Sequence, residues 1–336
     1  MQLNSILKVI KLFELDKKTI SIILNNIPLN IKINIEMLNK VFLKFKNVKK
    51  VLITNGIYNN ITTNNSITII IEYNDDYYVK NNLINPYLNY LSYIKKYNIQ
   101  PYESMLLTNQ ITAYTIGGLV LKYILESKFN IRFITHLSSI NDIHDKHFDE
   151  IDIKKLPLNE NDNLIILDNR VKLLMEKAIK KARNHSISLN GSLETIVLNI
   201  PEYLGDYTYS LKSLTSFILY TIPTLYSIEY DNGSLLDGEK NNFPLKEIKF
   251  EDDKLISNYC NIVDNNIGII TNKKTIIKCF FTPDSIQKEI CTINYQTLEN
   301  FQILKESINP ISFTEYTHSI EAFISISLFE LISKEG

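Results

Sequence analysis

Tryptophan is absent from this 336-residue chain, and arginine occurs only at Arg132, Arg170 and Arg183. Alanine is almost as scarce, with four residues, whereas asparagine, isoleucine, lysine and tyrosine are abundant. AT-rich codons favour the second group of residues over the first. We therefore infer an AT-biased genome, such as that of a reduced intracellular bacterium, in which a surface Asn or Lys says little about function.

Cysteine is also rare, and Cys260, Cys279 and Cys291 lack the CxxC spacing of a zinc site. An odd number of widely spaced thiols argues against a disulfide framework and favours reduced thiols in a cytoplasmic protein. No apolar run reaches the ~18 residues that a membrane-spanning helix needs. The first residues lack a small-residue cleavage site, so we expect no signal peptide.

Charge is balanced, with 36 Lys and Arg against 37 Asp and Glu and a net charge of -1. A basic stretch interleaved with aromatic residues is missing, so the sequence gives no support to a nucleic-acid or membrane partner. Hydrophobic residues make up 45% of the chain and charged residues 22%, which is typical of a folded protein with a sizeable core.

Familiar catalytic motifs are missing too, since the chain has no GxxxxGK[ST], GxGxxG or HExxH. His144 and His147 have a spacing that suits a metal, but a solvated loop explains them as well and no metal site is predicted. His185 follows a helical pattern, where it would contact the helix dipole. His318 opens an apolar helical pattern and is interpreted as a polar residue at the helix start.

Apolar periodicity predicts helices and strands that alternate along the chain. β-branched runs of strand length cover 66–73, 193–200 and 275–281. Helical spacing covers 35–45, 117–129, 170–183 and 318–334, the last of which is apolar on nearly all sides. Interspersed helices and strands predict an α+β layered fold.

The segment 200–233 keeps prolines and glycines at irregular places while its other residues have changed. Its parts "PEYLGDYTY" and "YTIPTLYSIEYDNGS" resemble P-A-G-L-G-E-P-V-F and S-I-P-A-V-K-G-x-E-I-G of chorismate synthases. Pro201, Gly205, Pro223 and Gly233 are retained, and such residues set backbone dihedrals that others replace poorly. The chain is identified on these motifs as similar to that family.

The resemblance continues in the same order along nearly the whole chain. "ILKVIKLFELDK" is similar to L-F-R-V-T-T-F-G-E-S-H-G, and "NNIPLNI" to D-G-x-P-A-G-L. "ISLNGSLETIVLNIP" is similar to D-S-x-G-G-x-x-E-x-x-x-x-N-x-P. Further retained residues include Glu14, Pro28, Gly56, Thr62, Thr63, Ile67, Asp75, Pro86, Lys96, Glu194, Asn199, Pro310, Glu321 and Ala322.

The resemblance implies a fold and a reaction. The fold is a β-α-β sandwich with helices packed between antiparallel sheets, as a single domain over residues 1–336 in a homotetramer. The reaction is the 1,4-elimination of phosphate from 5-enolpyruvylshikimate 3-phosphate to chorismate in the shikimate pathway of aromatic amino-acid biosynthesis. The cofactor is reduced FMN, and the family is also associated with NADP.

By the same resemblance, two turns and a loop would contact the flavin. Pro223 and Thr224 match the family's I-P-A turn, and Pro283 and Ser285 match its K-P-T-P-S segment. Gly268 matches a G-G loop between them. A purely structural turn remains the alternative for each of these residues, and we predict no catalytic acid.

The chain departs from the family where charge is expected. Asp16 stands at the histidine of G-E-S-H-G, Ile308 at the histidine of R-H-D, and Thr282 at the lysine of F-K-P. The family's G-G-R-S-S-A-R-E-T falls within 103–112, which contains no arginine.

These departures leave two hypotheses open. The first is a divergent chorismate synthase in which Lys96, Lys273 and Lys274 partly replace the lost arginine charge. The second is a catalytically degenerate, non-enzymatic scaffold of the same fold. The missing arginines favour the scaffold. The retained full-length reading frame indicates continued selection and favours the enzyme.

Overall fold

The protein is described by a computed structural model. The residues that it describes are 7–16, 18–45, 47–74, 103–151, 165–185, 191–201, 226–230, 233–234, 248–251, 254–257, 274–281, 290–293, 301–304 and 313–335.

The first sheet is antiparallel throughout and has the strand order β1-β2-β6-β3. Alternate residues of β6 are buried, as expected for a sheet with one face on the core and one exposed. The strands are β1 (Ile10–Asp16), β2 (Thr19–Leu24), β3 (Val48–Asn55) and β6 (Ile67–Tyr73).

The second sheet has the order β11-β10-β14-β9-β7-β8, again with antiparallel neighbours. Its strands are β7 (Arg132–Ile140), β8 (Ile143–His144), β9 (Gly191–Leu198), β10 (Tyr226–Tyr230), β11 (Gly233–Ser234) and β14 (Lys274–Phe281). Three two-stranded pairs complete the described strands: β4 (Ile57–Tyr58) with β5 (Ile61–Thr62), β12 (Ile248–Glu251) with β13 (Lys254–Ser257), and β15 (Ile290–Ile293) with β16 (Phe301–Leu304).

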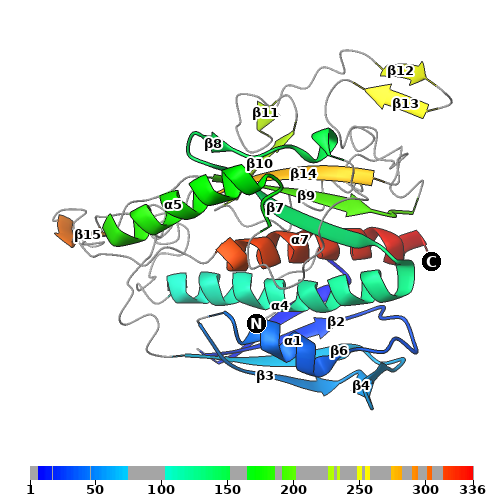
Figure 1. Cartoon of the computed structure of the whole chain (residues 1–336). Helices are drawn as coiled ribbons and strands as arrows, with labels where there is room; N and C mark the ends of the chain where they lie inside the picture. Colours follow the sequence, from blue (N-terminus) through cyan, green and yellow to red (C-terminus); the bar gives the residue numbers. More distant parts are fainter. Residues whose placement is uncertain are drawn as a thin grey trace.

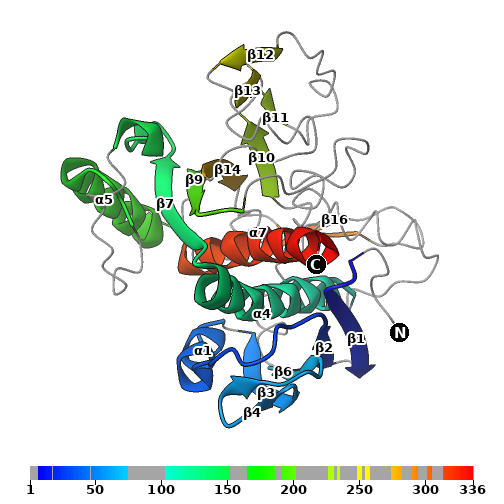
Figure 2. The same ribbon diagram turned by 90° about the vertical axis from the view of Figure 1, so that its right-hand side faces the viewer.

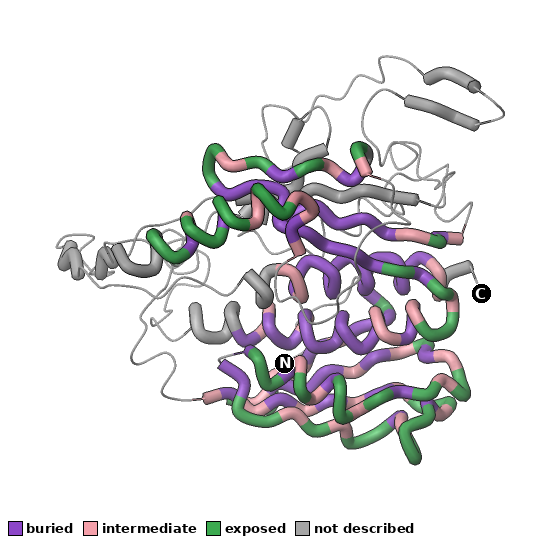
Figure 3. The backbone as a smooth tube through the Cα atoms, viewed as in Figure 1, coloured by how far each residue is buried: buried purple, intermediate pink, exposed green. Residues whose placement is uncertain are grey.

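Two long helices, α4 (Glu103–Phe129) and α7 (Phe313–Glu335), lie between the sheets (Figures 1 and 2). α4 packs on the first sheet, and α7 lies between α4 and the second sheet. The buried backbone is concentrated in these helices and in the faces turned toward them (Figure 3). The predicted α+β sandwich, with helices between antiparallel sheets, is confirmed.

Glycines at the centre of α4 allow this close packing. A Cβ at Gly118 would lie 2.5 Å from the carbonyl oxygen of Ala322 on α7. A Cβ at Gly117 would lie 2.7 Å from Ile10 Cδ1 on β1. Thr115 on α4 donates to Ser319 on α7 over 3.2 Å, so α4 and α7 run parallel and begin at the same end of the sandwich.

The other helices lie outside this layer. α1 (Ile35–Phe42) is capped by Asn34, whose Oδ1 accepts from Met37 N at 3.0 Å. α5 (Asn169–His185) and the single turn η1 (Phe148–Glu150) lie beside the second sheet (Figure 1). Over the described residues, we find no helix with both the length and the apolar character needed to cross a bilayer.

Candidate active site

The residues predicted to contact a cofactor, Pro223, Thr224, Gly268, Pro283 and Ser285, all lie outside the described residues. Described strands nevertheless flank two of them in the sequence: β10 follows Pro223, and β14 precedes Pro283.

The second sheet pairs the described strands that follow Pro223 and precede Pro283 in the sequence. β10 begins three residues after Pro223, and β14 ends two residues before Pro283. The register pairs Tyr226 with Phe281, so the chain enters β10 next to the point where it leaves β14. Tyr226 and Phe281, which are 55 positions apart in the sequence, therefore lie side by side at one end of this sheet.

The same end of the sandwich is where α4 and α7 begin. Phe281 also pairs with Gly191, and Gly191 pairs with Ile140 at the end of β7. β7 follows α4 after a short turn and runs back along it, because Phe133 lies beside Lys122 while Thr135 lies beside Glu321. Helix starts carry unpaired N–H groups and a partial positive charge, which favour anions at this end.

Lys274, expected to replace lost arginine charge, is placed elsewhere. It begins β14 and pairs with Leu198, at the far end of the strand from Phe281. Seven steps of about 3.3 Å separate the two ends by roughly 23 Å. This placement does not favour Lys274 as a ligand of a phosphate near Pro283. Lys96 and Lys273 lie outside the described residues.

Buried polar groups tie the chain after α1 to the first turns of α4. Asn47 Nδ2 donates to Thr112 Oγ1 at 2.8 Å and to Asn109 Oδ1 at 3.3 Å. The Tyr73 hydroxyl donates to the Asn109 carbonyl at 2.7 Å. The segment 103–112, which we predicted to match an arginine-rich stretch of the resembled family, is therefore held to the end of the first sheet through Asn109 and Thr112.

His318 lies at this junction and makes an unusual set of contacts. Its ring centroid is 6.4 Å from that of Phe45, just after α1. Both ring nitrogens are buried, and neither has a hydrogen-bond partner among the described residues. Burial lowers the pKa of His318, Lys122 and Lys44 lower it further, and Glu321 opposes them.

The sequence patterns did not indicate this buried environment of His318. We interpreted His318 as the polar start of a helix, and this was wrong because α7 begins at Phe313 and places His318 in the second turn. A neutral imidazole with both nitrogens unpaired can donate one hydrogen bond and accept another. Buried polar atoms without partners are rare, so the two ring nitrogens of His318 stand out as unused hydrogen-bonding groups among the described residues.

A buried network fixes the helices just below His318. Glu321 Oε2 accepts from Lys122 Nζ at 2.6 Å, and Glu321 Oε1 accepts from Thr135 Oγ1 at 2.9 Å. Thr135 Oγ1 also lies 2.9 Å from Thr195 Oγ1 on β9, within hydrogen-bond distance. Burial opposes charge on Lys122, but Glu321 and Glu126 raise its pKa, so it stays protonated. The network joins α4, α7 and two strands.

Asp16, predicted to stand at the family's histidine, lies at the turn between β1 and β2. Its Oδ1 accepts from Lys18 N at 2.7 Å, and this bond lowers the pKa of the carboxyl. The side chain is exposed, so Asp16 remains an ionised turn residue. Glu14 lies half-buried on the same strand, opposite Ile20.

The predicted His-x-x-His loop is built differently from a metal site. His144 is exposed, and His147 Nδ1 lies 3.6 Å from Glu194 Oε1. Among the described residues no group of three or more His, Cys, Asp or Glu side chains could hold a metal ion. The buried histidine nearby is His136, and each of its ring nitrogens contacts a carboxylate. Nε2 lies 2.9 Å from Glu194 Oε2, and Nδ1 lies 3.3 Å from Asp145 Oδ2.

Comparisons with known proteins agree with one another. The sequence model of the family described as "Chorismate synthase" matches residues 8–332. A chorismate synthase of Prochlorococcus marinus (strain CCMP1986) is 25% identical over 337 aligned positions, covering 92% of this chain and 90% of that protein. One from Methanosphaera stadtmanae is 30% identical over 267 positions, covering 76% and 71%.

A solved structure has the same fold. It is titled "Crystal Structure of Chorismate Synthase" and superposes with a TM-score of 0.62 at 17% identity. The superposition covers 98% of this chain and 93% of that one.

Proposed function

Since this chain belongs to the chorismate synthase family, we propose that it converts 5-enolpyruvylshikimate 3-phosphate to chorismate by 1,4-elimination. The reaction removes one proton and one phosphate and has no net redox change. The observation that carries the proposal is the family match over residues 8–332, nearly the whole chain. The sandwich fold is in accord with it.

We assign reduced FMN to the end of the sandwich where α4 and α7 begin. The contacts proposed for it are Pro223, Thr224, Gly268, Pro283 and Ser285. Support comes from the pairing of Tyr226 with Phe281. Tyr226 follows Pro223 by three residues, and Phe281 precedes Pro283 by two. When bound, the reduced flavin supplies an electron transiently to the substrate and so eases cleavage of the C–O bond.

The described residues fit anionic ligands at this end. The parallel starts of α4 and α7 offer N–H groups to phosphate oxygens. His318 offers two buried ring nitrogens without partners among the described residues, and its lowered pKa keeps the ring neutral, so that it can hold or accept a proton. The Lys122–Glu321 pair holds α4 and α7 in place beneath it.

The remaining features follow from the family. The proposed molecule is a cytoplasmic homotetramer and a single domain over residues 1–336, with NADP associated with it as with the family.

The second candidate is a scaffold without catalytic activity. The observation that favours it is Asp16, which stands at the family's histidine and is engaged in a turn. The absence of arginine from 103–112 points the same way.

Genetic complementation separates these functions. The chain is expressed in a bacterium that lacks chorismate synthase, together with a flavin reductase, on medium without aromatic amino acids. We expect growth, with an authentic chorismate synthase as positive control and an empty vector as negative control. A soluble, abundant protein that does not restore growth would support the scaffold.

A further inference from the structure

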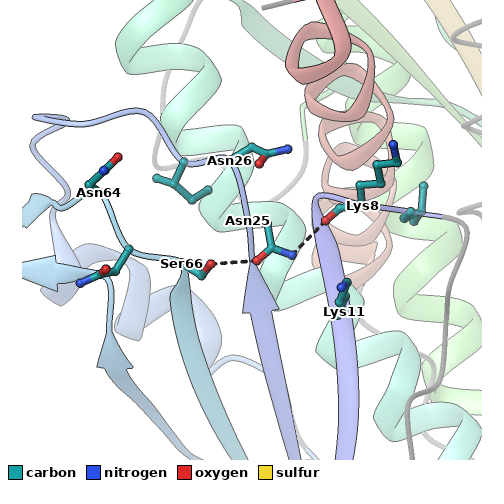
Figure 4. A pocket seen from close by; sticks show the side chains of 9 residues that line it. Lys8, Lys11, Asn25, Asn26, Asn64 and Ser66 are labelled. Carbon is teal, nitrogen blue, oxygen red and sulfur yellow. Dashed lines mark hydrogen bonds between the residues drawn. The ribbon is translucent and has the colours of Figure 1, made fainter.

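A polar pocket opens at the other end of the first sheet, where β1 begins, β2 ends and β6 begins. It has a volume of about 620 Å³, within the range of small-molecule sites. Side chains from all three strand ends line it, including Lys8, Lys11, Asn25, Asn26, Asn64 and Ser66 (Figure 4).

Hydrogen bonds between the three strand ends hold the pocket in shape. Asn25 Nδ2 donates to the Lys8 carbonyl at 2.9 Å, and Ser66 Oγ donates to Asn25 Oδ1 at 2.8 Å (Figure 4). Asn25 thus links the beginning of β1 to the beginning of β6. Both polar atoms of its amide take part in these bonds, and Asn26, Asn64 and Asn65 are exposed amides at the rim.

The floor of the pocket is anchored to the core. Glu330, near the end of α7, is buried, and its Oε2 accepts from the backbone N–H groups of Lys8 at 2.9 Å and Val9 at 3.0 Å. Leu7 and Ile27 are buried beneath the polar rim. The backbone that carries Lys8 is therefore fixed before any ligand arrives, which reduces the entropy lost on binding.

Charge in the pocket has one sign. Lys8 and Lys11 are its only ionisable lining residues, and neither forms a salt bridge within the part of the chain that the structure describes. The other polar lining groups are amides and one hydroxyl. Two ammonium groups without a carboxylate partner, beside neutral hydrogen-bond donors, suit an oxyanion with two or more negative charges.

We propose that this pocket binds a small molecule carrying a multiply charged oxyanion group, either phosphate or carboxylate. Lys8 and Lys11 donate to the anion, and Asn26 and Asn64 donate from the rim. The site lies at the beginning of β1, whereas the candidate active site lies where β1 ends, so the ligand binds in addition to the substrate. The inference rests on the pocket alone and not on the proposed reaction.

Isothermal titration of the full chain at low ionic strength with inorganic pyrophosphate, and separately with citrate, tests the proposal. We expect saturable binding of at least one anion, weakened about tenfold or more in a Lys8→Gln/Lys11→Gln variant, because charge-assisted hydrogen bonds are lost. The anion that binds with the lower Kd, pyrophosphate or citrate, identifies the recognised group as phosphate or carboxylate.

A matched control removes two other charges, from the first sheet and from the helix beside it, away from the pocket. Lys40→Gln/Lys50→Gln takes away two exposed lysines of α1 and β3, and its affinity should stay within about twofold of the parent. Thermal unfolding of both variants checks that they are folded. Absence of saturable binding, or equal loss in both double variants, would overturn the proposal.

Discussion

His136, which is buried, and His318, whose ring nitrogens are buried, differ in their partners, and the pKa of each shifts in a different direction. Burial alone would lower the pKa of His136, but hydrogen bonds to Asp145 and Glu194 raise it above the usual value. His318 has no such bonds among the described residues, and burial lowers its pKa. The partners of His136 therefore favour its charged form, whereas burial of His318 favours its neutral form.

We predict that stability depends on His318 in mildly acidic solution. Because its folded pKa is lowered, the unfolded chain binds more protons below pH ~6.5, and stability falls as the pH drops from there toward the folded pKa. A His318→Phe variant should lose this part of the slope between pH 5 and 7. Urea unfolding of both proteins, with an NMR titration of the ring, measures it; a ring that titrates at or above its usual pKa would contradict it.

His136 should behave in the opposite sense. Its raised pKa contributes stability that is complete below pH ~6.5 and is lost as the pH rises through the folded pKa. His136→Leu leaves Asp145 and Glu194 buried without their cation, which costs about 3–5 kcal/mol. Urea unfolding at pH 6 measures this loss.

The exposed His144 provides the control for that experiment. His144→Gln should change the free energy of unfolding by no more than about 0.5 kcal/mol. Equal effects of the two substitutions would show that the buried pairing of His136 is not what stabilises the fold.

At the scale of elements, the contact between α4 and α7 depends on Gly118. Alanine is a better helix former than glycine by about 1 kcal/mol, yet we predict that Gly118→Ala lowers stability by about 1–3 kcal/mol. The added Cβ would meet the Ala322 carbonyl oxygen at 2.5 Å. Thermal unfolding is the measurement.

A second substitution tests the cause. Ala322→Gly removes the facing methyl group but leaves the carbonyl, so it should rescue Gly118→Ala only in part. Full rescue would place the clash on the Ala322 side chain, and a stabilised Gly118→Ala protein would show that the helices can separate freely.

The end of α7 is predicted to hold the beginning of β1. Glu330→Gln keeps the shape of the side chain and removes the charge from two hydrogen bonds, which should cost about 1–3 kcal/mol. The amides of Lys8 and Val9 should exchange faster in hydrogen-exchange measurements, while those at the centre of β6 keep their protection relative to global stability. Unchanged exchange at Lys8 and Val9 would contradict this anchoring.

Sequence patterns located the elements better than their ends. The pattern that predicted a helix over 117–129 began at the glycine pair, Gly117 and Gly118. α4 instead begins at Glu103 and contains the glycine pair, because the close contacts with Ala322 and Ile10 leave no room for a side chain there. Such a requirement comes from distant chain segments and leaves no local signal.

For the whole molecule, the residues shared with the family explain the fold more than the chemistry. Gly56 has φ of +85°, and a Cβ there would lie 2.5 Å from Ile67 Cα. Thr62 Oγ1 donates to the Pro28 carbonyl at 2.6 Å and accepts from Ile31 N at 2.8 Å. The resemblance could therefore predict the sandwich.

The candidate site was less predictable. Lys122 pairs with Glu321 from nearly 200 residues away, and the contact of His318 with Phe45 also joins distant segments. Neither contact has a local pattern, and the family motifs pointed to the positions of Asp16 and Ile308 instead. The structure rather than the sequence identifies His318 as a group with unused hydrogen-bonding capacity at this end of the sandwich.

The decisive experiment on the whole molecule is an anaerobic assay of the purified chain with 5-enolpyruvylshikimate 3-phosphate and chemically reduced FMN. Chorismate formation is followed by absorbance against a control without enzyme. We expect turnover above that control, lost when the flavin is left oxidised. A folded protein that forms no chorismate at saturating flavin and substrate would contradict the enzymatic function and leave a preserved scaffold.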